Sequence, residues 1–114
     1  MGLDMFAYKV PKKNIINDFK FKKSDDVIEF AYWRKHNHLH GWFYNLYHLK
    51  GGVKDFDLVP LRLRTKDLNQ LEEDIKYRNL LPAKDFFYKY DLEFIENARK
   101  AIQDGYAVYY NSWW

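Results

Sequence analysis

Two parts of the sequence combine aromatic rings with side chains that can bind an anion. Residues 32–43, which read YWRKHNHLHGWF, hold four aromatic rings, two cations, an amide and three imidazoles. The chain also ends in Trp113 and Trp114, whose large apolar surface is costly to leave in water. Because aromatic rings stack on nucleobases and Arg or Lys binds phosphate, this inventory suits a nucleotide-type ligand. The candidate ligand-binding residues are Trp33, Arg34, Asn37, His40, Trp113 and Trp114.

The same rings have a second, structural interpretation. Aromatic residues at helical spacing usually form core, and Arg34 and Lys35 would then lie at the surface with their stems packed on apolar groups. We give this interpretation more weight for the rings of residues 32–43. The two terminal tryptophans should dock on the domain, line a cleft or contact a partner.

The histidines and the catalytic motifs point away from a metal site or an enzyme. His36 and His40 stand four residues apart and could share a metal ion. A zinc site needs a further ligand, and the sequence has no cysteine and no HExxH. It also has no glycine-rich phosphate loop, no GxSxG elbow and no Walker lysine. We therefore expect a non-enzymatic protein without metal or cofactor, and a small hydrolase or nuclease acting through His40 stays an alternative.

Composition restricts the class of protein. The 114 residues are 47% hydrophobic and 31% charged, which is typical of a folded domain and far from a disordered chain. The absence of cysteine fits a reducing compartment, and no apolar run approaches the ~20 residues of a membrane span. We expect a cytoplasmic protein with no membrane partner. The net charge is only +3, and the basic residues are not gathered on one helix face but interspersed with acidic ones, so sequence-specific DNA binding ranks last. The one basic patch would comprise Lys12, Lys13, Lys20, Lys22 and Lys23.

The elements that would position these residues follow from periodicity. Apolar residues at helical spacing predict one long central helix over 27–49 and shorter helices over 66–78 and 92–103. Alternating or β-prone segments predict strands over 3–10, 18–23, 56–64 and 106–111, with a further short strand at 86–88. The expected fold class is α+β: one domain spanning residues 1–114, with a long central helix and two shorter helices packed on a small, mainly antiparallel sheet.

Several segments together resemble a known family. They are MGLDM at residues 1–5, AYWRK at 31–35 followed by Asn37, His40 and Trp42-Phe43, LLP at 80–82, and YYNSWW at 109–114. This combination resembles a family of small phage- and prophage-encoded proteins, and the matches extend over the whole chain. Similar proteins often carry more residues before the central helix and around LLP. Members are usually called hypothetical, so the resemblance implies a setting, an infected bacterial host, and no activity.

Two functional hypotheses follow. In the first, the chain is a host-takeover or anti-defence protein that binds and sequesters a small nucleotide-type signalling molecule, and it could do so as a homo-oligomer. In the second, it inhibits a host or defence protein by docking through an aromatic patch, with Trp and Tyr as the main contacts.

Overall fold

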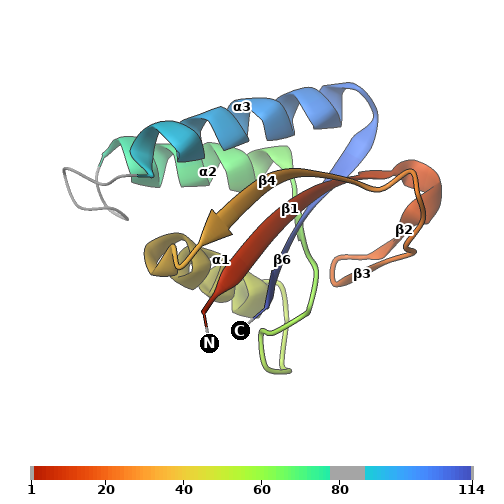
Figure 1. The fold of residues 1–114 in the computed structure, drawn as a ribbon, viewed down its shortest axis with the longest axis horizontal. Coiled ribbons are helices and arrows are strands. Elements are labelled where there is room, and N and C mark those ends of the chain that lie inside the picture. Colours follow the sequence, from red (N-terminus) through yellow and green to blue (C-terminus); the bar gives the residue numbers. More distant parts are fainter. Residues whose placement is uncertain (1, 78–86, 114) are drawn as a thin grey trace.

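A four-stranded antiparallel sheet forms the centre of the computed structural model, which describes residues 2–77 and 87–113 (Figure 1). In spatial order its strands are β4 (Ile28–Arg34), β1 (Asp4–Pro11), β6 (Tyr106–Trp113) and β5 (Leu61–Leu63). The helices are α1 (Asn37–Leu49), α2 (Thr65–Lys76) and α3 (Tyr88–Gln103). The predicted α+β class is therefore confirmed.

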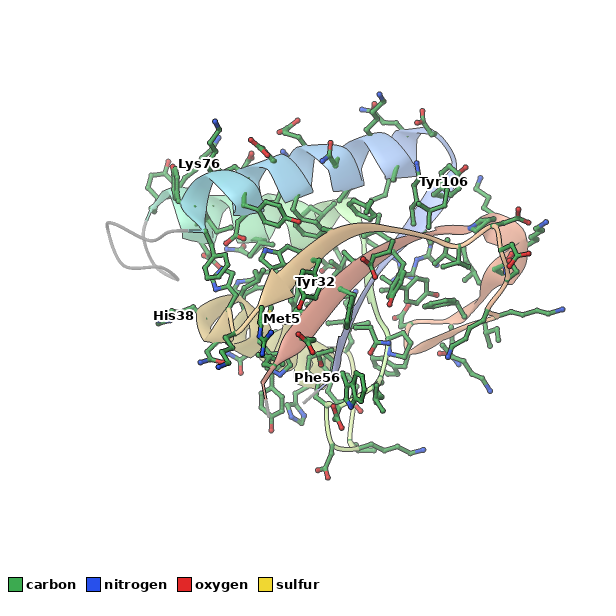
Figure 2. The ribbon with its side chains drawn as sticks, in the orientation of Figure 1. Met5, Tyr32, His38, Phe56, Lys76 and Tyr106 are labelled. Atoms are coloured by element: carbon green, nitrogen blue, oxygen red, sulfur yellow. The ribbon has the colours of Figure 1, made fainter. Side chains whose placement is uncertain are left out.

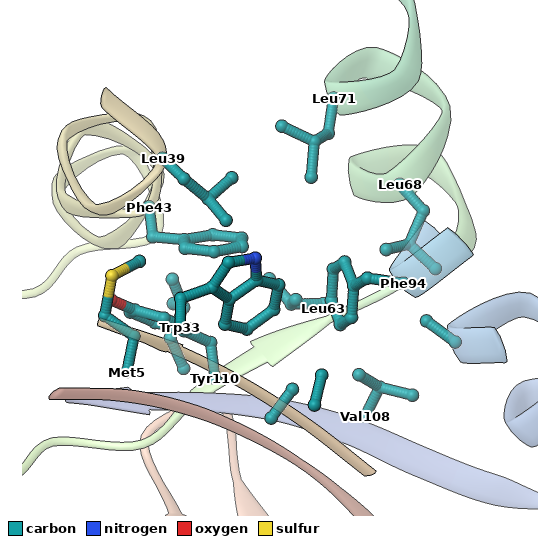
Figure 3. Packing of buried hydrophobic residues seen from close by; sticks show 14 of the residues in the cluster. Met5, Trp33, Leu39, Phe43, Leu63, Leu68, Leu71, Phe94, Val108 and Tyr110 are labelled. Carbon is teal, nitrogen blue, oxygen red and sulfur yellow. The ribbon is translucent and has the colours of Figure 1, made fainter. Parts of the chain in front are cut away.

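The three helices share a core with one face of the sheet. Figure 3 shows Leu39 and Phe43 of α1, Leu68 and Leu71 of α2, and Phe94 of α3 around the Trp33 indole. Alternation along the strands brings every second side chain to this face, which explains why the rings of β4 and β6 alternate between core and outer surface. Such a large aromatic core gives a small domain much of its buried apolar area.

A hairpin covers part of the outer face of the sheet. It is formed by β2 (Ile15–Asn17) and β3 (Lys20–Phe21), which follow a short 3-10 helix, Lys12–Asn14. Phe21 packs on the buried Tyr109 ring, with 4.9 Å between ring centroids, and the Tyr109 hydroxyl donates a hydrogen bond to the Asn17 carbonyl. The rest of the outer face, towards the N-terminal end of β1, carries half-buried or exposed side chains.

The predicted helix over 27–49 is wrong in its first part. Ile28–Arg34 is strand β4, which pairs with β1, and a helix begins only at Asn37. Lys35 has a φ of 57°, a left-handed conformation that interrupts regular structure between the two elements. Residues 28–34 fit both periods, and pairing with β1 decides for the strand because it buries Ala31 and Trp33 while hydrogen-bonding the backbone.

Smaller differences concern the ends of elements. The strand predicted over 56–64 is limited to Leu61–Leu63. Residue 87 is a turn and Tyr88 already belongs to α3, so the short strand predicted at 86–88 is wrong at these two positions, while residue 86 lies outside the described part of the chain. Residue 78, where the second predicted helix ended, lies outside it as well. Within the described residues, no helix is long and apolar enough to cross a bilayer.

Candidate ligand-binding site

A pocket of about 580 Å³ lies between the edge strand β4 and the first turns of α3. We call it the edge pocket. It combines four aromatic residues, two cations and one carboxylate, namely Tyr32, Trp33, Arg34, Phe87, Lys89, Tyr90 and Glu93. Its size falls in the range of ligand sites, and aromatic walls with a few charged groups are typical of them.

Tyr90 joins the two walls of the edge pocket. Its hydroxyl accepts a hydrogen bond from the backbone N–H of Tyr32, 3.0 Å from N to Oη. Its ring meets the Trp33 indole edge to face, with centroids 5.7 Å apart. Because the hydroxyl is anchored on the strand, the ring is held at the pocket while 40% of the residue stays exposed.

Contacts with β1 hold the Tyr32 side chain in place. Its hydroxyl donates a 2.7 Å hydrogen bond to Asp4 Oδ1, and its ring packs on Phe6 with centroids 5.4 Å apart. This hydrogen bond, followed by partial burial, raises the pKa of Tyr32, so the phenol stays neutral at physiological pH. The pocket therefore offers two phenol rings whose hydroxyls are held by hydrogen bonds.

A buried hydrogen-bond network supports these walls. The Asp91 carboxylate accepts the Trp33 indole N–H at 2.8 Å and lies 2.7 Å from His36 Nε2. The His36 ring stacks on Phe87 at 4.0 Å between centroids. The Asp91 carboxylate, which has no exposed surface, thus contacts Trp33 directly. It reaches Phe87 indirectly, through the His36 ring.

The charge of the edge pocket favours an anion. Arg34 and Lys89 are both exposed, and neither forms an ion pair with any residue in the described ranges. The Arg34 guanidinium lies beside Gly2, where an added Cβ would be 3.4 Å from Nη2. The positive end of the α3 macrodipole adds to the two cations, and Glu93 offsets one of them. A planar ligand with negative charge matches this combination of rings and cations.

The structure divides the six sequence-predicted residues among separate places. Trp33 and Arg34 line the edge pocket, although the Trp33 indole is almost fully buried. Asn37 and His40 line a second pocket of about 570 Å³. Figure 2 labels one residue of each pocket, Tyr32 in the edge pocket and Phe56 in the second pocket. Trp113 is 56% exposed on the outer sheet face, and Trp114 lies outside the described residues.

The second pocket has the opposite charge character. Beside Asn37 and His40 it is lined by Asp55 and Asp57, with Tyr44 and Phe56 as its rings. His40 Nδ1 lies 2.6 Å from the hydroxyl of the buried Tyr110. Burial lowers the pKa of His40, partly offset by the negative charge of Asp57, and burial also raises the pKa of Tyr110. With two carboxylates and a largely neutral imidazole, this pocket is a poor site for phosphate.

His36 and His40 do not form a pair that could share a metal ion. His36 precedes α1 and is bonded to Asp91, whereas His40 contacts Tyr110 and stacks on Phe56. Among the residues of 2–77 and 87–113, no three His, Asp or Glu side chains are grouped to hold a metal.

Sequence reasoning missed Tyr90, Lys89 and Asp91. All three lie between the short strand predicted at 86–88 and the helix predicted over 92–103. The contacts that matter join residues 55 to 58 positions apart, such as Trp33 with Asp91, and no local pattern encodes them. The one available signal was the aromatic and basic composition of residues 86–90, FFYKY.

Comparisons with protein-family models, curated proteins and solved structures find no match to this chain.

Proposed function

We propose that this protein binds a small, planar, anionic ligand of nucleotide type in the edge pocket and acts by sequestering it. The observation that carries the proposal is that Arg34 and Lys89, two cations without ion-pair partners in the described ranges, flank the exposed rings of Tyr32 and Tyr90. Rings stack on a base, and the cations bind phosphate.

The setting of the proposal comes from the resemblance of the sequence to small phage proteins. In an infected bacterium, the ligand would be a signalling nucleotide of a host defence system. Binding without turnover lowers the free concentration of such a molecule in proportion to the amount of protein, so a non-enzymatic protein can serve this purpose.

Isothermal titration calorimetry tests the proposal directly. The panel comprises cyclic dinucleotides, ADP-ribose derivatives and the common mononucleotides, titrated into the full chain. We expect at least one ligand to bind with micromolar affinity or better, about −8 kcal/mol. If every ligand binds more weakly than about millimolar, near −4 kcal/mol, the proposal is wrong.

Variants then locate the binding. Removing one charged hydrogen-bond donor should weaken binding about tenfold or more, so we expect this loss for Arg34→Ala and for Lys89→Ala. Lys100→Ala is the matched control, because Lys100 is an exposed cation near the other end of α3. Equal affinity in all three variants would place the ligand elsewhere.

The outer sheet face supports a second candidate function, docking on a host or defence protein. Asp4 of β1 lies between Arg34 of β4 and Trp113 of β6, so a cation and an exposed indole occupy one row of the sheet. Tyr32 and Phe6 are paired two residues further along the same two strands. Exposed aromatic residues beside an arginine are typical of interface hot spots.

Affinity capture with matched variants tests the second function. A protein that is captured by the wild-type chain and by Leu49→Ala, but lost with Trp113→Ala, would support it. Leu49 is the control because it is an exposed apolar residue away from this face. A partner that remains bound to Trp113→Ala would contradict docking through Trp113.

A further inference from the structure

The main chain of β4 contributes hydrogen-bonding groups to the edge pocket. β4 is an outer strand, so only alternate residues direct their N–H and C=O towards β1. The Lys35 N–H donates to the Leu3 carbonyl at 2.8 Å, which places Lys35 and, by alternation, Trp33 on the β1 side. Tyr32 and Arg34 therefore direct their backbone groups to the free edge, and both residues line the pocket.

One of these edge groups is already occupied. The Tyr32 N–H is bonded to the Tyr90 hydroxyl. The Tyr32 C=O and the Arg34 N–H have no hydrogen-bond partner among the residues that the structure describes. What remains is an acceptor, the Tyr32 C=O, followed two residues later by a donor, the Arg34 N–H, with the Arg34 C=O beyond it on the side away from Tyr90.

This pair is too short to add a further strand. A peptide that extends the sheet needs a run of alternating donors and acceptors, and Tyr90 blocks the edge at Tyr32. A single planar heterocycle needs only two adjacent groups. The pair at the edge therefore matches a base better than it matches a peptide.

We infer that the edge pocket recognises adenine through the Tyr32 C=O and the Arg34 N–H, an inference that rests on the proposed function. Adenine presents a donor, the N6 amine, beside an acceptor, N1. The amine donates to the Tyr32 carbonyl and N1 accepts from the Arg34 N–H. Guanine and hypoxanthine carry the acceptor O6 beside the donor N1–H, so the same pose sets carbonyl against carbonyl and N–H against N–H. They match the edge only after a shift to the Arg34 N–H and C=O, which moves the base away from Tyr90.

The charged and aromatic groups then have defined tasks. The rings of Tyr90 and Phe87 lie at the same pocket as the edge pair and supply apolar surface for the base. The side chain of Arg34 and that of Lys89 are left for the phosphate. Base selection by backbone groups and phosphate binding by side chains can therefore be tested separately.

A titration series with one changed base tests the inference. AMP, IMP, GMP and purine riboside 5′-monophosphate share the ribose and the phosphate and differ at the base edge. We expect AMP to bind about tenfold tighter than IMP or GMP, because a mismatched pair leaves polar groups unbonded. The purine nucleotide, which keeps N1 and lacks the 6-amine, should lie between them.

The outcomes separate the inference from the proposed function. If all four nucleotides bind with affinities within about threefold of one another, nucleotide binding stands and adenine recognition is wrong. If GMP or IMP binds tighter than AMP, adenine recognition is also wrong. If none of the four binds, adenine recognition is wrong, whereas the proposed function fails only if the cyclic dinucleotides and ADP-ribose derivatives do not bind either.

Amide hydrogen exchange provides a readout at the inferred contact. With saturating AMP, exchange at the Arg34 N–H should slow, because the base then occupies this donor. The Tyr32 N–H is the internal control, since it is already bonded to Tyr90 and should change little. Unchanged exchange at Arg34 with AMP bound would overturn the inference.

Discussion

The indole N–H of Trp33 donates a hydrogen bond to the carboxylate of Asp91, with 2.8 Å between Nε1 and Oδ1 and both residues buried. This bond joins β4 to α3, the two elements that form the edge pocket. His36 shares the same carboxylate through its Nε2. The pocket and the core are therefore connected by one buried acidic group.

Replacing Asp91 should destabilise the fold. Asp91→Ala removes the partner of both the Trp33 and the His36 ring nitrogens, and leaving buried polar groups unbonded should cost about 3 kcal/mol. Denaturant unfolding measures the loss. The matched control, Asp25→Ala at an exposed position, should change stability by less than ~0.5 kcal/mol. A loss below about 1 kcal/mol for Asp91→Ala would contradict the role given to this network.

Removing the Tyr90 hydroxyl should open the edge of β4 locally. In Tyr90→Phe the Tyr32 N–H loses its acceptor, so its amide exchange should accelerate about fivefold, the equivalent of ~1 kcal/mol. Tyr44→Phe is the control, since Tyr44 is similarly exposed and its hydroxyl has no hydrogen-bond partner within the described ranges. Equal exchange of the Tyr32 N–H in Tyr90→Phe and in the wild type would contradict its hydrogen bond to the Tyr90 hydroxyl.

His40 should make stability depend on pH. Burial lowers its pKa below the ordinary value of about 6.5, so the unfolded chain takes up a proton at higher pH than the folded protein does. Stability from this residue is complete above about pH 6.5 and is lost as the pH falls towards the folded pKa. The stability difference between wild type and His40→Gln should shrink over this interval.

Nuclear magnetic resonance can follow the same group directly. The His40 ring signals should titrate with a midpoint below about 6.5. Asp57→Asn should lower the midpoint further, because the Asp57 charge favours the protonated imidazole. A wild-type midpoint at or above 6.5 would show that burial does not dominate at this site.

Two glycines in and after α1 should respond in opposite directions to alanine. At Gly41, within the helix, an added Cβ meets no atom within 4 Å, so Gly41→Ala should stabilise by about 0.5–1 kcal/mol. At Gly52 the same atom would overlap the ring of the buried Tyr47, so Gly52→Ala should destabilise. Thermal unfolding of both variants measures these changes. A Gly52→Ala variant more stable than Gly41→Ala would contradict the packing of Tyr47 against Gly52.

Much of the fold could be predicted from local signals. Strands β1 and β6 lie within one to two residues of the predicted ranges, because each alternates between core and outer face. The amphipathic spacing of α2 and α3 identified both helices, since Leu68, Leu71 and Phe94 face the core. The segment 27–34 was misassigned because its residues fit a helical stripe as well as a strand, and long-range pairing with β1 decides between them.

The candidate site was less accessible to sequence. Of the six predicted ligand-binding residues, Trp33 and Arg34 line the edge pocket. Asn37 and His40 follow so closely in sequence that they suggest the same pocket, but the turn at Lys35 directs them to another. Lys89 and Tyr90 come from a helix more than 50 residues away, and only the tertiary fold brings them to β4.

The most direct measurement of the central claim is chemical-shift mapping of the full chain with a saturating nucleotide. Binding at the edge pocket predicts that the largest amide shifts cluster at Tyr32, Arg34, Lys89 and Tyr90, with the second pocket at Asn37 and Asp55 unchanged as the internal control. Shifts that cluster at the second pocket, or no shifts with any nucleotide of the panel, would contradict it.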